Sequence, residues 1–316
     1  MNLRLTALVA ALAAPATSLA LVAGGSAARV AYPPAANGRI AFSTDFGPDP
    51  QIFTVNADGS GETQVTQSTD GHATNPRFSP DGRRIVFQGD ATGKWQLYEI
   101  NADGSGRHQL FSDPDANDLQ PALSPDGKRI AFARCPQDSH NCAITVANLD
   151  GSGMSQLTDL VWNSGNPDWS PDGTKLSFDS NQDGLLSAVW VMNADGSNQQ
   201  RLTAPPLEAD FARWSPNGKQ IVFTDLCCLF GSNEWVMNAN GSQQRMLTHF
   251  GEHHQGGNAA WSPDGTQIAL TSDLAYTEPC ENFCGDVYTM SADGRRLTRI
   301  VSDHPDVFSL DWGRKP

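Results

Sequence analysis

Residues 166–203 read NPDWSPDGTKLSFDSNQDGLLSAVWVMNADGSNQQRLT, and they contain a pattern that the chain repeats. Four short segments, in which apolar residues alternate with polar ones, are separated by sequences rich in proline, asparagine, aspartate and glycine. Alternation of this kind predicts half-buried strands, and these punctuating residues predict tight turns. One repeat therefore predicts an antiparallel sheet of four strands.

The same two turns recur along the chain with a period of about 45 residues, which is typical of propeller blades. The turn of the SPDG type begins at Ser79, Ser124, Ser170, Ser215 and Ser262. The turn of the NADG type begins at Asn56, Asn101, Asn148, Asn193, Asn238 and Ser291. Aromatic and aliphatic columns between the turns repeat in nearly every unit, so they predict the packing core between blades. We expect an all-β, six-bladed propeller with four-stranded antiparallel blades.

The two ends of the repeat region complement each other. Residues 37–43 match a second strand without a first, and residues 308–313 match a first strand with Trp312 in the aromatic column. The C-terminal strand should therefore complete the N-terminal blade, which removes two free sheet edges. The predicted propeller spans residues 37–316, after a short linker over residues 29–36.

Residues 1–28 are typical of an export signal, with Arg4 followed by an uncharged stretch and then small residues suited to cleavage. We expect a secreted or periplasmic protein with no membrane span after cleavage. The uncharged stretch from Leu5 to Val22 is long for a signal, so an uncleaved membrane anchor is the alternative.

The formal net charge is −14, with 35 acidic residues against 21 lysines and arginines. Nucleic-acid binding depends on clustered basic residues, so this charge argues against a nucleic-acid partner. Cations and basic protein surfaces are better partners for such a surface. The chain is expected to be a monomer.

All six cysteines fall in the turn between the second and third strands of a blade. In an exported protein this placement predicts local disulfides, Cys135 with Cys142 and Cys280 with Cys284. Adjacent Cys227 and Cys228 either form a vicinal bridge or remain free. A zinc site is the alternative, although only His140 lies near these turns.

The repeats PRFSPDGRRIVF (76–87), PDWSPDGTKLSF (167–178) and AAWSPDGTQIAL (259–270) resemble TolB-type, WD-repeat-like β-propellers. The resemblance implies the fold. TolB itself is a periplasmic protein whose propeller docks a lipoprotein at one end of its channel. TolB also has an amino-terminal α/β domain, which this chain is expected to lack. Similar propellers precede the catalytic domain of prolyl oligopeptidase relatives, but the chain contains no GxSxG motif.

Connectors between the fourth strand of one blade and the first strand of the next should converge around one mouth of the channel. They carry many carboxylates and five of the seven histidines. The alternative is that these loops are polar only because they are exposed to solvent, and that they form no ligand site. Our candidate ligand site at this mouth comprises His72, Asp118, Glu208, Asp210, His253, His254 and His304.

The sequence DSNQDG resembles the opening of a calcium loop, with oxygen side chains at Asp179, Asn181 and Asp183. A calcium loop has glutamate at its twelfth position, where this chain has Trp190, so an ordinary turn is the alternative. The one cofactor that the sequence suggests is thus a divalent cation such as calcium.

No catalytic residue can be assigned, because the motifs are turns and core. We expect an exported, non-catalytic binding or scaffold protein that engages a protein or saccharide partner at the channel mouth. The alternative is a small metal-dependent lyase or hydrolase with its site in the same funnel.

Overall fold

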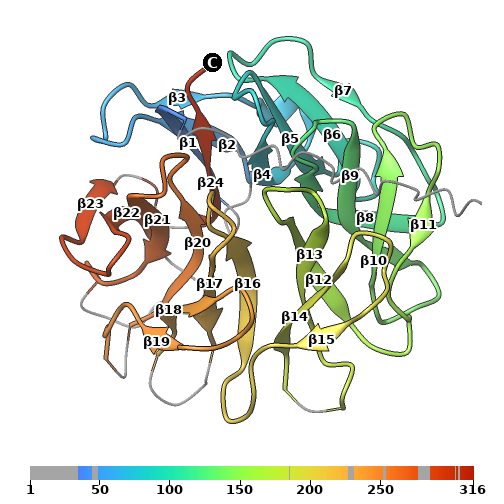
Figure 1. Cartoon of the computed structure of the whole chain (residues 1–316). Helices are drawn as coiled ribbons and strands as arrows, with labels where there is room; N and C mark the ends of the chain where they lie inside the picture. The colour runs from blue at the N-terminus through green and yellow to red at the C-terminus, as the bar shows by residue number, and fades with distance from the viewer. Residues whose placement is uncertain are drawn as a thin grey trace, which may run out of the picture. The chain divides into compact units, whose positions relative to one another are not determined.

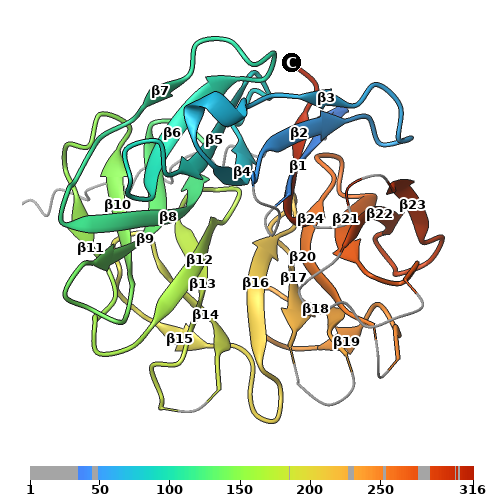
Figure 2. The same cartoon turned by 180° about the vertical axis from the view of Figure 1, so that it is seen from behind.

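The computed structural model contains six four-stranded antiparallel sheets arranged as the blades of a propeller (Figures 1 and 2). It describes residues 35–44, 49–184, 186–226, 231–251, 254–276, 285–302, 304 and 307–316, all within one compact unit. The expected export signal therefore lies outside the described residues. Within the described residues, no helix has the length and apolar character that crossing a membrane requires.

The first strands of the six blades contact one another around the ring, so they line the central channel. They are β24 (Val307–Arg314) in blade 1, β4 (Ala73–Phe78) in blade 2, β8 (Ala116–Leu123) in blade 3, β12 (Ser164–Trp169) in blade 4, β16 (Ala209–Trp214) in blade 5 and β20 (Gly256–Trp261) in blade 6.

The other strands follow outward in the same blade order. The second strands are β1 (Asn37–Thr44), β5 (Arg84–Gly89), β9 (Arg129–Pro136), β13 (Lys175–Ser180), β17 (Gln220–Asp225) and β21 (Gln267–Ser272). The third strands are β2 (Ile52–Val55), β6 (Gln96–Asn101), β10 (Ala143–Asn148), β14 (Ala188–Asn193), β18 (Asn233–Asn238) and β22 (Asp286–Ser291). The fourth strands are β3 (Thr63–Gln64), β7 (His108–Gln109), β11 (Ser155–Gln156), β15 (Gln200–Arg201), β19 (Arg245–Met246) and β23 (Thr298–Val301). A 3-10 helix, η1 (Ser68–Asp70), precedes β4.

The SPDG turn connects the first strand to the second by side-chain hydrogen bonds. Ser79 Oγ donates to Asp81 Oδ1 at 2.6 Å and accepts from the Arg84 amide at 2.9 Å. Gly82 has φ +72°, and a Cβ there would lie 2.1 Å from the Arg314 carbonyl oxygen. The glycine is therefore required both by backbone conformation and by space.

The predicted apolar columns form the core between blades. Phenylalanine fills one column of the second strand in five blades and is fully buried in each: Phe42, Phe87, Phe132, Phe178 and Phe223. Leu270 holds the same position in blade 6 and is also fully buried. Because every blade repeats the column, it explains the fold and not a site.

Blade 1 closes the ring as the sequence predicts. Strand β24 pairs with β1 in an antiparallel register that places Ile40 opposite Trp312 and Phe42 opposite Leu310. Trp312 Nε1 also donates to the Gly38 carbonyl at 3.3 Å. In Figure 1 the red C-terminal strand accordingly lies beside the blue first strand of the chain.

One of the predicted disulfides lies within the described residues. Cys135, within β9, and Cys142, directly before β10, are joined by a disulfide that closes the turn between the two strands. Cys227, Cys228, Cys280 and Cys284 lie outside the described residues, so their pairing stays a prediction.

Candidate functional site

One column of the first strands varies from blade to blade instead of repeating. It is the position just before the aromatic column, and its side chains meet at one end of the channel. From blade 1 to blade 6 it holds Asp311, Arg77, Ala122, Asp168, Arg213 and Ala260. The order aspartate, arginine, alanine thus occurs twice around the ring. A column that changes while its neighbours repeat is where a site is expected.

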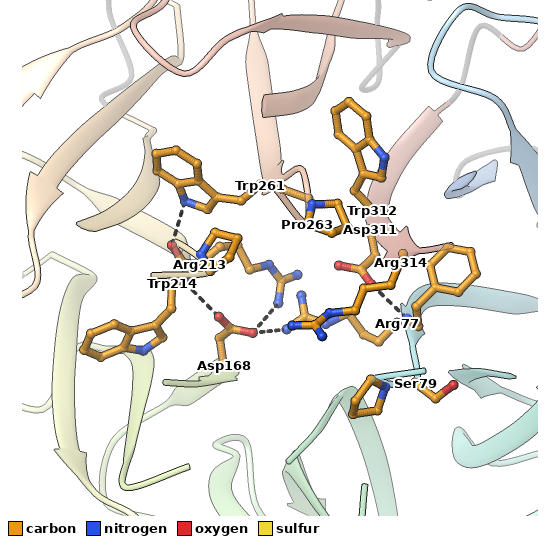
Figure 3. Close-up of a pocket in the computed structure, with 15 residues that line it drawn as sticks. Arg77, Ser79, Asp168, Arg213, Trp214, Trp261, Pro263, Asp311, Trp312 and Arg314 are labelled. Carbon is orange, nitrogen blue, oxygen red and sulfur yellow. Dashed lines mark hydrogen bonds and ion pairs between the residues drawn. The ribbon is translucent and has the colours of Figure 1, made fainter. Parts of the chain in front are cut away.

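Three of the four charged members of this column, Arg77, Asp168 and Arg213, form an ion-pair network across the channel (Figure 3). Arg77 Nη2 lies 2.5 Å from Asp168 Oδ1, and Arg213 Nη1 lies 3.9 Å from the same oxygen. The backbone amide of Trp214 donates to Asp168 Oδ2 at 2.9 Å. These contacts join blades 2, 4 and 5, so the network depends on the closed ring.

A pocket of about 190 Å³ opens between these charges and the SPDG turns. Its walls combine charged groups with flat apolar faces. They include Arg77, Asp168, Arg213, Asp311 and Arg314, the indoles of Trp214, Trp261 and Trp312, and the turn prolines Pro80, Pro216 and Pro263. The pocket therefore lies at the end of the channel where the first strands finish, opposite the connector mouth.

Three hydrogen-bond donors in this pocket have no acceptor among the described residues. They are Arg77 Nη1, Arg213 Nε and Trp214 Nε1, and all three atoms are buried. Arg77 as a whole is only 6% exposed. Buried donors are nearly always paired in native proteins, so these three imply an acceptor that the chain itself does not supply.

The pKa values of the two carboxyl groups favour a positive pocket. Burial raises the pKa of Asp168 to about 6, although Arg77 and the Trp214 amide oppose the shift. Burial also raises the pKa of Asp311, with Arg77 again opposing the shift. The lining therefore presents three guanidinium groups against two carboxyls that hold their protons more strongly than usual.

Two of the residues predicted for the connector mouth, Glu208 and Asp210, lie together in a second cavity. The cavity has a volume of about 280 Å³ and lies between blades 4 and 5. It also includes Asp179 and Asn181, two of the three residues of the predicted calcium loop. The third, Asp183, does not line the cavity, and its carboxylate pairs with Arg201.

The predicted mouth histidines are not brought together in the described residues. Each pairs with a carboxylate of its own. His72 Nδ1 lies 2.9 Å from Asp90, His254 Nδ1 lies 3.4 Å from Asp273, and His304 Nε2 lies 2.8 Å from Glu62. His304 also packs against Phe53, a residue of β2, with 4.5 Å between the ring centroids. His253 lies outside the described residues.

Asp118 does not line an open mouth, contrary to our expectation. It lies within β8, it is fully buried, and Arg134 Nε lies 3.5 Å from its Oδ1. Burial raises the pKa of Asp118 to about 6, although Arg134 opposes the shift. In the part of the chain that the structure describes, no three His, Cys, Asp or Glu side chains are grouped so that they could hold a metal ion.

The arginine-lined pocket was not predicted from the sequence, although a signal for it was present. The four charged residues are neighbours in sequence of the aromatic column and the SPDG turns, which the repeat predicts to be core and turns. A comparison of the six blades at this one position shows a charged residue in four blades and alanine, Ala122 or Ala260, in the other two. The sequence favours the connector loops as the site instead, because they hold five of the seven histidines.

Comparison with known proteins agrees with this fold. The family model described as the TolB beta propeller domain matches residues 8–160. TolB from Acinetobacter baumannii is 21% identical, with a TM-score of 0.71, over 88% of this chain and 67% of that chain. A putative TolB from Agrobacterium tumefaciens is 20% identical, with a TM-score of 0.67, over 88% of this chain and 98% of that chain.

A third solved structure belongs to an enzyme. An oligogalacturonate lyase in complex with manganese is 14% identical, with a TM-score of 0.55, over 83% of this chain and 73% of that chain. At such identities these likenesses show the fold alone. A search of curated protein sequences returned no match. The repeated SPDG and NADG turns and the six closed blades show a six-bladed β-propeller, and its family match is to the TolB beta propeller domain.

Proposed function

We propose that this chain is an exported, non-catalytic binding protein that holds an acidic segment of a protein partner at the SPDG end of its channel. The observation that carries the proposal is the set of buried, unpaired donors on Arg77, Arg213 and Trp214. A carboxylate is the acceptor that matches guanidinium donors best, because the two groups form charge-assisted hydrogen bonds.

The pocket lining is suited to binding and offers little for covalent chemistry. Ser79 supplies the one hydroxyl group of the described lining, and that hydroxyl is used in the turn with Asp81 and Arg84. No histidine, cysteine or glutamate belongs to the described lining. The tryptophan faces provide apolar area beside the guanidinium groups, a combination that is enriched where proteins bind proteins.

Export is supported by two features of the chain. The sequence of residues 1–28 is typical of an export signal, and the Cys135–Cys142 disulfide is a bond that persists in oxidising compartments. Export is tested by N-terminal sequencing of the protein recovered from the cell envelope and the medium. A chain that begins near residue 29 is expected, and a cytosolic chain that retains Met1 would contradict export.

Binding is tested by calorimetry with two peptides of equal length, acetyl-tetraglutamate amide and acetyl-tetraglutamine amide. We expect the acidic peptide to bind at least about tenfold more tightly, since hydrogen bonds to charged groups contribute about 1.5–3 kcal/mol. Arg213→Gln should abolish most of this preference. Arg295→Gln is the matched control, because the side chain of Arg295 is 84% exposed in the turn before β23. Equal affinity for the two peptides would contradict the proposal.

The same measurement with trigalacturonate separates the other candidates. Binding of this saccharide in place of the peptide, with the same loss in Arg213→Gln, would indicate a uronate ligand instead of a protein segment. Release of an unsaturated product in the presence of manganese or calcium would instead support the lyase alternative.

A further inference from the structure

The cavity between blades 4 and 5 concentrates negative charge without any base. It is lined by three carboxylate residues, Asp179, Glu208 and Asp210, together with Asn163, Gly165, Asn181, Leu186 and Ser187. No lysine, arginine or histidine belongs to this described lining. An accumulation of acceptors of this kind calls for a cationic ligand.

The fold holds Asp179 in a buried position with one oxygen unused. Asp179 is 7% exposed, and its Oδ2 accepts a hydrogen bond from Asn166 Nδ2 at 3.0 Å. Its Oδ1 has no hydrogen-bond partner among the described residues. Asp210 is held from the neighbouring blade, where it accepts a hydrogen bond from the hydroxyl of Ser187. A buried carboxylate oxygen without a donor is unstable unless a ligand supplies one.

Three other largely buried aspartates of this propeller have a guanidinium group beside them. Asp118 has Arg134 at 3.5 Å, Asp168 has Arg77 at 2.5 Å, and Asp286 has Arg299 at 2.7 Å. In the part of the chain that the structure describes, no such ion pair reaches Asp179 or Asp210. These two carboxylates therefore differ from the other three in lacking a cation.

The pKa values of Asp179 and Asp210 agree with the absence of a neighbouring cation. Burial and the neighbouring Asp210 raise the pKa of Asp179 well above its ordinary value, although hydrogen bonds from Asn166 and from the Phe211 amide oppose the shift. Burial likewise raises the pKa of Asp210, and Glu208 adds to the shift. A cation between the two blades would reverse both effects, because it favours the charged form of each carboxyl group.

We propose that this cavity binds an alkyl cation with N–H donors, a guanidinium or ammonium group on a short apolar stem. The N–H groups would reach the free oxygen of Asp179 and the carboxylate of Asp210. The side chain of Leu186 provides an apolar surface for the stem. The volume of about 280 Å³ suits such a group better than a bare metal ion, for which the described residues offer no cluster of three ligands.

The site does not depend on the arginine-lined pocket, and the two proposals can fail separately. One concerns an anionic ligand at the SPDG end of the channel, and the other a cationic ligand between two blades on the connector side. Their tests use different probes and different variants.

The test uses N-acetyl-arginine amide and N-acetyl-citrulline amide, which have nearly the same shape but differ in charge. Calorimetry at constant ionic strength should show that the arginine compound binds at least about tenfold more tightly to the protein. Asp179→Asn keeps the shape of the side chain and should weaken binding of the arginine compound at least about tenfold. Asp183→Asn is the control within the same loop, and its affinity should stay within about twofold of the wild-type value.

Equal binding of the two amides, or unchanged binding in Asp179→Asn, would overturn the proposal. Displacement of the arginine compound by equimolar calcium would also overturn it, because the site would then be a metal site. If Asp179→Asn loses its far-ultraviolet circular dichroism, Glu208→Gln at the same cavity replaces it. The same weakening is then expected, and unchanged affinity in that variant contradicts the proposal.

Discussion

Glu234 is the residue that departs most clearly from the repeat. Its column on the third strand is otherwise aliphatic: Ile52, Leu97, Ile144, Val189 and Val287. Glu234 is nevertheless fully buried, and its carboxyl group accepts a hydrogen bond from the hydroxyl of Thr224 at 3.3 Å. Burial raises the pKa of Glu234 to about 8, although Thr224 opposes the shift. The side chain is therefore neutral in the folded protein over most of the physiological range.

This residue predicts a specific dependence of stability on pH. The folded-state pKa of Glu234 exceeds the ordinary value of 4.5, so the folded state binds the proton more strongly. Its contribution is fully present below about pH 4.5 and is lost as the pH rises toward 8, at up to ~1.4 kcal/mol per pH unit. In urea unfolding between pH 5 and 8, wild type should lose stability relative to Glu234→Gln. Parallel curves for the two proteins would show that Glu234 is ionised in the fold.

Arg77 and Asp168 provide a second prediction at this scale. Removing Arg77 leaves a largely buried carboxylate with only the more distant Arg213 as its cation, so Arg77→Gln should cost about 3 kcal/mol in the free energy of unfolding. The double variant with Asp168→Asn should cost clearly less than the two single changes together, by about 1–3 kcal/mol. Urea unfolding of the four proteins measures this coupling. Strict additivity would mean that the ion pair does not form in solution.

The strands and turns of this fold could be predicted from the sequence because the same sequence pattern recurs in nearly every blade. SPDG fixes the turn through Ser79, Asp81 and Gly82, and the same bonds recur at Ser124 and Ser262. Strand β24 lacks a following SPDG turn, yet Trp312 in the aromatic column was enough to identify it. Local sequence therefore determines turns, strands and closure, because each depends on residues close together in the chain or repeated along it.

Strand β24 should be as important for stability as any continuous first strand. Trp312 and Trp261 are a matched pair, 5% and 7% exposed, and each indole donates to a carbonyl at 3.3 Å. We expect Trp312→Ala and Trp261→Ala each to cost about 3–5 kcal/mol in the free energy of unfolding. Urea unfolding measures both variants. A cost below about 1 kcal/mol for Trp312→Ala alone would show that blade 1 opens without unfolding the ring.

At the scale of the whole molecule, two pockets on opposite sides of the propeller differ in charge. The SPDG end of the channel collects arginines in a chain of net charge −14, whereas the connector side holds Asp179, Glu208 and Asp210. The sequence predicted the acidic connectors. It did not predict the arginine end, because Arg77 and Asp168 lie 91 residues apart and meet only across the closed ring.

The expected cluster of histidines shows the limit of the same reasoning. Connectors emerge on one face, but their side chains pair with nearby carboxylates before they can reach one another. His72 bonds Asp90 within blade 2, and His304 lies against Phe53 and Glu62 in blade 1. Topology can therefore place a loop at a mouth, while the direction of each side chain depends on contacts that the repeat does not encode.

A crystal structure of the protein with acetyl-tetraglutamate amide tests the proposed function most directly. A peptide carboxylate is expected in the pocket at the SPDG end, within hydrogen-bond distance of Arg77 Nη1 and Arg213 Nε and beside the indole of Trp214. A pocket that stays empty at saturating peptide, or a peptide bound only on the connector side, would contradict it.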